Sequence, residues 1–256
     1  MFKFIVRAQQ QRLYLLLLQG ALCIYASATD HLSYEIEQTY PHNPLLFTQG
    51  LAIDAGFLYE SSGLYGQSAL YRYHWPSLEL EQTIRLPPNL FAEGIAIIKQ
   101  ELLQLTWQEQ LLLRYQLPQL STKESLSYHG EGWGLTADGA ALYMTDGSGC
   151  ITKRSMNDFN IIKRFCIDQA QRYGWRLNDL AYQAGFLYIQ VYGQDLLLKV
   201  DASNGKLIAQ ADLSKLRQQI ADSPNAGVCN GITRIDDNRL LITGKYWPLF
   251  FVIRWQ

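Results

Sequence analysis

Polar and apolar positions follow one pattern five times along this chain. Each copy opens with a short motif of polar, aromatic or glycine residues and continues as an apolar strand. The first apolar residues of these strands lie 40 to 52 residues apart, at Leu51, Ile95, Leu135, Leu180 and Ile232. A strand-built repeat of about 40–50 residues is typical of the blades of a β-propeller. The sequence therefore predicts an all-β fold, a five-bladed β-propeller.

Each repeat contains further segments whose alternation suits a strand packed on both faces. Second strands are expected at 57–61, 102–107, 141–146, 186–192 and 239–245. Third strands include 69–73 and 196–200. More polar fourth strands are expected at 79–86, 122–128, 160–167 and 206–213.

The last repeat lacks an outer strand, because the chain ends at Gln256 after the third one. Residues 32–40 have the pattern of a strand that belongs to no repeat. We predict that this N-terminal strand is the outer strand of the last blade, which closes the ring and removes an exposed strand edge. Residues 214–223 are rich in helix formers and predict a short helix before the fifth blade.

The first 28 residues have the features of a secretory signal peptide. Basic residues precede an apolar stretch at 13–25, and Ala26-Ser27-Ala28 supplies small residues at the cleavage spacing. A membrane anchor is the alternative, but the stretch is short for a bilayer span. We expect a signal peptide at 1–28, one catalytic propeller domain at 29–256, and a secreted or periplasmic location.

The charge of the chain argues against some partners. The net charge is −1, and the N-terminal 28 residues carry basic but no acidic side chains. The remaining domain is therefore mildly acidic, and it has no run of Lys and Arg typical of a nucleic-acid surface. We expect no nucleic acid and, after signal removal, no membrane as partner, and we expect a monomer.

The cysteines and histidines suggest a disulfide but no metal site. Cys150 and Cys166 lie symmetrically about Asp158, in a segment that resembles a hairpin turn. Either a disulfide across two antiparallel strands or two free thiols fits this spacing. Cys229 is expected to be a small buried core residue. No Cys or His pair has the spacing of zinc ligands, so we expect no metal and no cofactor.

The residue two positions before each aligned apolar residue is not an aliphatic core residue. These five residues are Gln49, Glu93, Trp133, Asn178 and Asn230. Equivalent positions of a radial repeat face the same place, so we expect the five side chains to surround one central site. This ring is the first indication of function.

Within the ring, Glu93 is the candidate acid–base group, since desolvation by the channel walls would raise its pKa. Lys245 can place a fixed positive charge nearby, and Trp107 and Trp133 can form apolar walls. The ring asparagines, Asn178 among them, can donate hydrogen bonds to an oxygen that gains charge. Structural alternatives stay open: a solvated carboxylate and lysine, tryptophans packed between blades, and asparagines that cap backbone groups.

Several motifs are longer than an ordinary propeller repeat supplies. They are Phe47-Thr48-Gln49-Gly50-Leu51, Glu60-Ser61-Ser62-Gly63-Leu64-Tyr65-Gly66, Phe91-Ala92-Glu93-Gly94-Ile95, Gly132-Trp133-Gly134-Leu135, Asn230-Gly231-Ile232 and Thr243-Gly244-Lys245-Tyr246-Trp247-Pro248. In this order they closely resemble the plant-type glutaminyl cyclases, also called glutamine cyclotransferases. The resemblance implies a five-bladed propeller that converts the N-terminal glutamine of a peptide or protein to pyroglutamate and releases ammonia. It also implies a zinc-independent acyltransferase of the aminoacyl-transfer type.

The resemblance assigns roles to the matched residues. The proton shuttle of the family matches Glu93, and its lysine and asparagine match Lys245 and Asn178. The pocket residues match Phe47, Gln49, Trp107, Trp133 and, in place of a third tryptophan, Tyr192.

Two positions depart from the family pattern. Tyr192 keeps an aromatic wall but adds a hydroxyl, and Ala181 replaces the second acidic residue of the usual Asn-Glu-Leu-Glu-Tyr motif. We expect effects on neighbouring groups rather than loss of activity. The rival function is a non-catalytic periplasmic propeller that binds a peptide or glycan in its channel. We favour catalysis because Glu93, Lys245 and Asn178 occur together.

Overall fold

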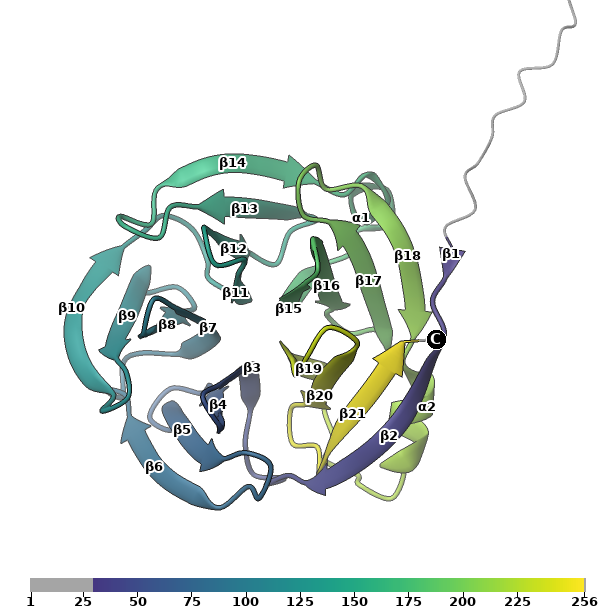
Figure 1. The fold of residues 1–256 in the computed structure, drawn as a ribbon, viewed down its shortest axis with the longest axis horizontal. Coiled ribbons are helices and arrows are strands. Elements are labelled where there is room, and N and C mark those ends of the chain that lie inside the picture. Colours follow the sequence, from purple (N-terminus) through teal and green to yellow (C-terminus); the bar gives the residue numbers. More distant parts are fainter. Residues whose placement is uncertain (1–29, 256) are drawn as a thin grey trace, which may run out of the picture.

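Five sheets surround a common axis in the computed structural model, which describes residues 30–255 (Figure 1). Their strands are antiparallel except for one short parallel pair at the edge of the fourth sheet. Each sheet follows one sequence repeat, so the prediction of a five-bladed propeller is confirmed. The predicted signal peptide at 1–28 lies outside the described residues.

In each blade, the opening strand of the repeat lies nearest the axis, and the later strands follow outward. The inner strands are β3 (Thr48–Asp54), β7 (Ala92–Ile98), β11 (Leu135–Ala137), β15 (Leu177–Gln183) and β19 (Cys229–Arg234). The second strands are β4 (Phe57–Ser62), β8 (Glu101–Thr106), β12 (Leu142–Thr145), β16 (Phe186–Val191) and β20 (Arg239–Gly244). The third strands are β5 (Ala69–His74), β9 (Leu111–Gln116), β13 (Cys150–Arg154), β17 (Leu196–Asp201) and β21 (Leu249–Trp255). The outer strands are β6 (Leu80–Arg85), β10 (Ser121–Ser127), β14 (Ile161–Cys166) and β18 (Leu207–Asp212).

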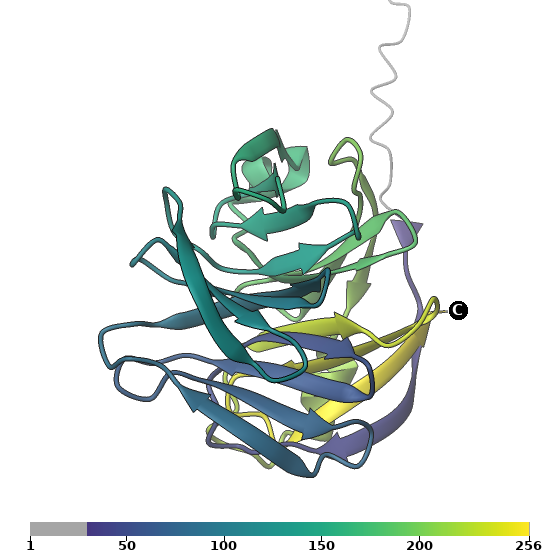
Figure 2. The same cartoon turned by 60° about the vertical axis from the view of Figure 1, so that its left-hand side comes forward.

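The N-terminal strand closes the ring, as predicted. Strand β2 (Tyr34–Pro41) pairs antiparallel with β21, and the two lie side by side in both views (Figures 1 and 2). A further strand, β1 (Asp30–His31), pairs in parallel with β18. Its two residues are too few to show an alternation, so the sequence pattern did not predict it.

A buried ion pair ties the end of β2 to the first blade. His42 Nε2 lies 2.8 Å from Glu60 Oε1, and His42 Nδ1 lies 2.6 Å from the carbonyl oxygen of Trp247. The hydroxyl of Thr48 donates to the same Glu60 oxygen at 2.7 Å. We call His42 and Glu60 the closure pair, because they join the first and last blades.

Two short helices lie in the connections around the fourth blade. Helix α2 (Ser214–Gln219) confirms the predicted helix but is shorter than 214–223. Helix α1 (Asp168–Tyr173) has only six residues and was not predicted. Across the described residues, no helix has the length and apolar character needed to cross a membrane.

The apolar core lies between neighbouring blades. Tyr59 and Ile95, for example, belong to the cluster between the first two blades, while Trp247 and Phe251 pack with α2 between the last two. Full burial of such a side chain contributes about 1.5–3 kcal/mol.

Strands β13 and β14 are also joined by a disulfide between Cys150 and Cys166, whereas Cys229 is a free, buried thiol.

The inner strands approach one another closely around the axis. A Cβ on Gly50 would lie 2.8 Å from the Cα of Gly94, and one on Gly94 would lie 2.6 Å from the backbone nitrogen of Leu135. Glycine in the opening motif permits this approach, since it has no Cβ. The fourth repeat has Asp179 at this position instead, and its buried carboxylate accepts a hydrogen bond from the Ile232 N–H at 2.8 Å.

Candidate active site

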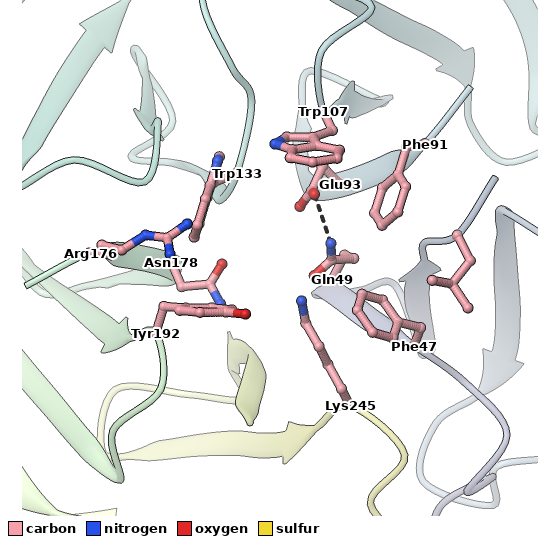
Figure 3. Close-up of a pocket in the computed structure, with 11 residues that line it drawn as sticks. Phe47, Gln49, Phe91, Glu93, Trp107, Trp133, Arg176, Asn178, Tyr192 and Lys245 are labelled. Atoms are coloured by element: carbon pink, nitrogen blue, oxygen red, sulfur yellow. Dashed lines mark hydrogen bonds between the residues drawn. The ribbon is translucent and has the colours of Figure 1, made fainter. Parts of the chain in front are cut away.

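A cavity of about 260 Å³ opens at one end of the channel, and all five blades contribute to its wall (Figure 3). The start of each inner strand pairs with the end of the second strand, as Leu177 does with Val191. Opening motifs and the residues after second strands therefore meet at the same end of the propeller. The lining residues are Phe47, Gln49, Leu64, Phe91, Glu93, Trp107, Trp133, Arg176, Asn178, Tyr192 and Lys245.

Eight of the nine residues predicted for the site thus line one cavity. The exception is Asn230, which is fully buried below it. Its amide Nδ2 donates to the side-chain oxygen of Gln49 at 2.8 Å and to the carbonyl of Thr48 at 2.9 Å. Asn230 was expected to face the central site with the other ring residues, but it does not line the cavity, because its amide forms blade-to-blade hydrogen bonds.

Glu93 is held at the bottom of the cavity by Gln49. The Gln49 amide Nε2 donates to Glu93 Oε1 at 2.7 Å, and the bond from Asn230 orients that amide (Figure 3). Burial raises the pKa of the Glu93 carboxyl well above its ordinary value, and the positive charge of Lys245 opposes only part of this rise. A carboxyl with a raised pKa can both accept and return a proton near neutral pH.

Lys245 faces the cavity from the end of β20. Its Nζ lies 4.1 Å from the centre of the Phe47 ring and 5.7 Å from that of Tyr192. Burial lowers the pKa of Lys245 to about 8, although Glu93 favours the charged form. Lys245 is therefore still mostly protonated at pH 7 and loses its positive charge as the pH rises through about 8.

Asn178 presents an amide that the protein leaves free. Its side chain is buried in the cavity wall, and no described residue forms a hydrogen bond with Nδ2. A buried donor without a partner is costly. An oxygen of a bound molecule would satisfy it, and an oxygen carrying negative charge would do so most strongly.

The two tryptophan walls share one support that the sequence analysis missed. The indole N–H groups of Trp107 and Trp133 both donate to Glu131 Oε2, each at 2.9 Å. Gln108 donates to the other carboxylate oxygen of Glu131 at 3.3 Å. Together these bonds outweigh burial and hold the pKa of Glu131 below its usual value. Glu131 thus fixes the orientation of both rings.

Arg176 was also missed, although the repeat contains the signal for it. The residue two before each ring position lies shortly before the inner strand. In the first, second and fourth repeats these residues are Phe47, Phe91 and Arg176, and all three line the cavity. In the third repeat the position is Glu131. The residues two positions before the ring residues form a second row, and considering this row would have identified Arg176 and Glu131.

Comparison with known proteins identifies the family of this chain. A family profile described as glutamine cyclotransferase matches residues 12–255. The chain belongs to the glutamine cyclotransferase family. It is 30% identical over 225 residues to a glutaminyl-peptide cyclotransferase of Arabidopsis thaliana, which covers 86% of this chain and 70% of that protein.

Solved structures agree with the family. The crystal structure of Myxococcus xanthus glutaminyl cyclase has a TM-score of 0.80 and 29% identity, over 89% of this chain and 98% of that one. A Bacteroides thetaiotaomicron protein of unknown function has a TM-score of 0.54 and 12% identity, over 80% of this chain and 58% of that one. At that identity, the second likeness concerns the fold alone.

Two features of this glutamine cyclotransferase family member bear on the earlier predictions. Ala181 is buried in the apolar cluster between the fourth and fifth blades, away from the cavity wall. The first acidic residue of the Asn-Glu-Leu-Glu-Tyr motif is kept as Asp179, two residues before Ala181. Within residues 30–255, no three His, Cys, Asp or Glu side chains are grouped as a metal ion would require.

Proposed function

We propose that this protein is a glutaminyl-peptide cyclotransferase, which converts the N-terminal glutamine of a peptide or protein to pyroglutamate and releases ammonia. The observation that carries the proposal is the set of groups at the bottom of the cavity. It combines a buried carboxyl of raised pKa, an ammonium and a free amide donor, at Glu93, Lys245 and Asn178. The relative in Arabidopsis thaliana carries this activity in its name.

The reaction forms one bond and breaks one. The neutral α-amine of the substrate attacks the carbon of its own γ-carboxamide, and the C–N bond to the amide nitrogen then breaks. The amine of a peptide has a pKa of about 7.7–8.0, so a large fraction is already neutral at physiological pH. The cavity would hold the glutamine folded, which favours attack within one molecule.

Glu93 moves the proton that this step requires. Its carboxylate accepts a proton from the attacking amine and returns it to the leaving nitrogen, which departs as ammonia. The hydrogen bond from Gln49 holds the carboxylate in place at 2.7 Å. Proton uptake and return balance, so no further reactant is needed.

Lys245 and Asn178 stabilise the negative charge that develops on the γ-carbonyl oxygen. Each well-placed donor of this kind is worth about 3–4 kcal/mol in the transition state. Phe47, Trp107 and Trp133 form apolar walls that exclude water from the reacting atoms. Tyr192 completes the wall and carries the hydroxyl at which this chain departs from the family pattern.

We further propose that the reaction is zinc-independent and that the enzyme is an acyltransferase of the aminoacyl-transfer type. The cavity supports this with a single carboxylate among its lining residues, beside amides, cations and aromatic rings. The test is to incubate the purified protein with a Gln-initiated peptide, with and without a chelator. We expect loss of the mass of ammonia at the same rate in both. Peptide binding without ammonia release would favour the non-catalytic propeller instead, and chelator-sensitive loss would overturn zinc independence.

We also propose export to the periplasm or the cell exterior, where the protein acts as a monomer. The disulfide between Cys150 and Cys166 supports an oxidising compartment. Fractionation of cells that produce the full chain, with N-terminal sequencing of the exported form, tests both this location and cleavage after residue 28.

A further inference from the structure

The guanidinium of Arg176 lies against two rings of the cavity wall. Its central carbon lies 4.7 Å from the ring centre of Trp133 and 4.7 Å from that of Tyr192 (Figure 3). Cation–π contacts of this kind attract the group and restrain its position. None of the N–H donors of this guanidinium forms a hydrogen bond with a described residue, so they are available to a bound molecule.

Arg176 differs from the arginines that stabilise this fold. Arg114 and Arg217, for instance, form close ion pairs with Glu101 and Asp195. Among the described residues, no side-chain hydrogen bond or ion pair engages the guanidinium of Arg176. It acts on Glu131 through space, but that carboxylate already accepts bonds from Trp107, Trp133 and Gln108.

Arg176 lies at a more exposed level of the cavity than Glu93 and Asn178. Glu93 and Asn178, which face the reacting atoms, are 4% and 2% exposed, whereas Tyr192 is 38% exposed and Arg176 is exposed beside it. The N-terminal glutamine reaches the bottom, so the residues that follow it must leave through the mouth. Of the charged residues that line the cavity, Arg176 alone is exposed at this level; Glu93 and Lys245 are buried.

We propose that Arg176 is a specificity-determining residue that receives a carboxylate just beyond the N-terminal glutamine, so that the enzyme prefers peptides with an acidic second residue. This inference rests on the proposed cyclotransferase function. A planar guanidinium matches a carboxylate with two parallel hydrogen bonds, which a lysine at the same place cannot form. The charge of Arg176 also opposes a basic second residue.

The test compares three peptide amides that differ only at the second position: Gln-Glu-Ala, Gln-Ala-Ala and Gln-Lys-Ala. The wild-type kcat/KM should be about fivefold higher for the acidic peptide than for the neutral one, the range of an exposed ion pair. In Arg176→Gln this ratio should fall to one, and in Arg176→Lys it should be intermediate. The control, Arg172→Gln, removes an exposed charge from α1 outside the cavity and should keep the wild-type ratio.

Binding separates this inference from the proposed function. Dissociation constants for the same peptides are measured calorimetrically on Glu93→Gln, which does not consume them, at low and high salt. A preference for Gln-Glu-Ala that weakens with salt and disappears in Glu93→Gln/Arg176→Gln supports the role of Arg176. Equal affinity for all three peptides, or a preference that survives loss of Arg176, overturns it. If wild-type protein releases no ammonia from any peptide, the proposed function fails, and the binding result still decides the role of Arg176.

Discussion

The cavity and the closure of the ring each contain a buried acid–base pair, but the two pairs are built differently. At the closure, His42 Nε2 and Glu60 Oε1 are in contact at 2.8 Å, and further hydrogen bonds hold both side chains. In the cavity, by contrast, no hydrogen bond or ion pair within residues 30–255 joins Glu93 to Lys245. The first pair is closed by contact, whereas the second faces an open space.

This difference has opposite effects on the titrating groups. Burial lowers the pKa of His42, but the charge and hydrogen bond of Glu60 and the carbonyl of Trp247 outweigh it, so the pKa is raised overall. In the cavity, burial raises the pKa of Glu93 and lowers that of Lys245 to about 8, and the attraction between them offsets only part of each shift. Contact with Glu60 favours the protonated form of His42, whereas burial has the larger effect on both Glu93 and Lys245, which are not in contact. Only the separated pair is suited to move protons at neutral pH.

The largest expected effect is on activity, from Glu93→Gln. This change keeps the shape of the side chain but removes proton transfer, which contributes about 10²–10⁴-fold to a rate. We expect kcat for a Gln-initiated peptide to fall at least about a hundredfold. Ammonia release, followed by mass, measures it. Wild-type rates in this variant would remove Glu93 from the mechanism.

The same variant should be more stable than the wild type. A carboxyl whose pKa is raised by folding contributes stability below its unfolded pKa, near 4.5, and this contribution is lost as pH rises through the folded value. Glutamine does not ionise, so Glu93→Gln does not lose this stability at neutral pH. Its Tm should therefore exceed the wild-type Tm at neutral pH, and the difference should vanish in acid. An equal Tm at every pH would contradict the raised pKa.

Lys245→Met should lower kcat by about a hundredfold, since it removes one oxyanion donor. Lys215→Met, which removes an exposed lysine of α2, is the matched control. In the wild type, loss of the Lys245 proton should produce an alkaline decline of kcat with a pKa of about 8. Lys245→Arg keeps its charge at higher pH and should shift this decline upward. An unshifted profile would assign the decline to another group.

Breaking the closure pair should affect stability rather than chemistry. Glu60→Gln leaves His42 buried without its counter-charge, which typically costs about 3–5 kcal/mol. Denaturant unfolding measures the loss, and Glu79→Gln, at an exposed position, is the control. Because folding raises the pKa of His42, its contribution is complete below pH 6.5 and is lost as pH rises through the folded value. A wild-type free energy of unfolding in Glu60→Gln would show that the pair is not needed.

The smallest effect is expected from Glu131→Gln. One amide oxygen replaces the carboxylate oxygen that accepts both indole N–H groups, so Trp107 and Trp133 lose a charged partner. We expect KM to rise about fivefold with little change in kcat, because the indole N–H groups keep an acceptor but lose the extra strength of a charged one. Tryptophan fluorescence should change in this variant but not in Glu124→Gln, which alters an exposed carboxylate of β10. A fall in kcat alone would place Glu131 in the chemistry instead.

Much of the fold could be predicted because it depends on local alternation and turns. The second and fourth strands agree with prediction to within one residue, and the missing outer strand of the last blade pointed to β2. The six-residue helix α1 and the two-residue strand β1 were not predicted, because segments this short show no period.

The candidate site was predicted less completely. The ring of opening-motif residues located Gln49, Glu93, Trp133 and Asn178 correctly, because a radial repeat places equivalent residues alike. It also included Asn230, which lies beneath Gln49. The repeat predicts that a side chain faces the axis of the propeller, but not whether it lines the cavity or lies below it. Asn230 could therefore not be distinguished from the equivalent residues of the other blades.

The sequence by itself determined the number of blades, the closure by the N-terminal strand and the row that contains Gln49, Glu93, Trp133 and Asn178. These properties follow from the periodic pattern of polar and apolar residues, which the sequence contains without reference to the fold. Only the folded ring joins Glu131 to two tryptophans and brings Arg176 against two rings, and only the folded ring buries Lys245 enough to lower its pKa to about 8. Burial and hydrogen bonding depend on neighbours from other blades, which lie far away in the sequence.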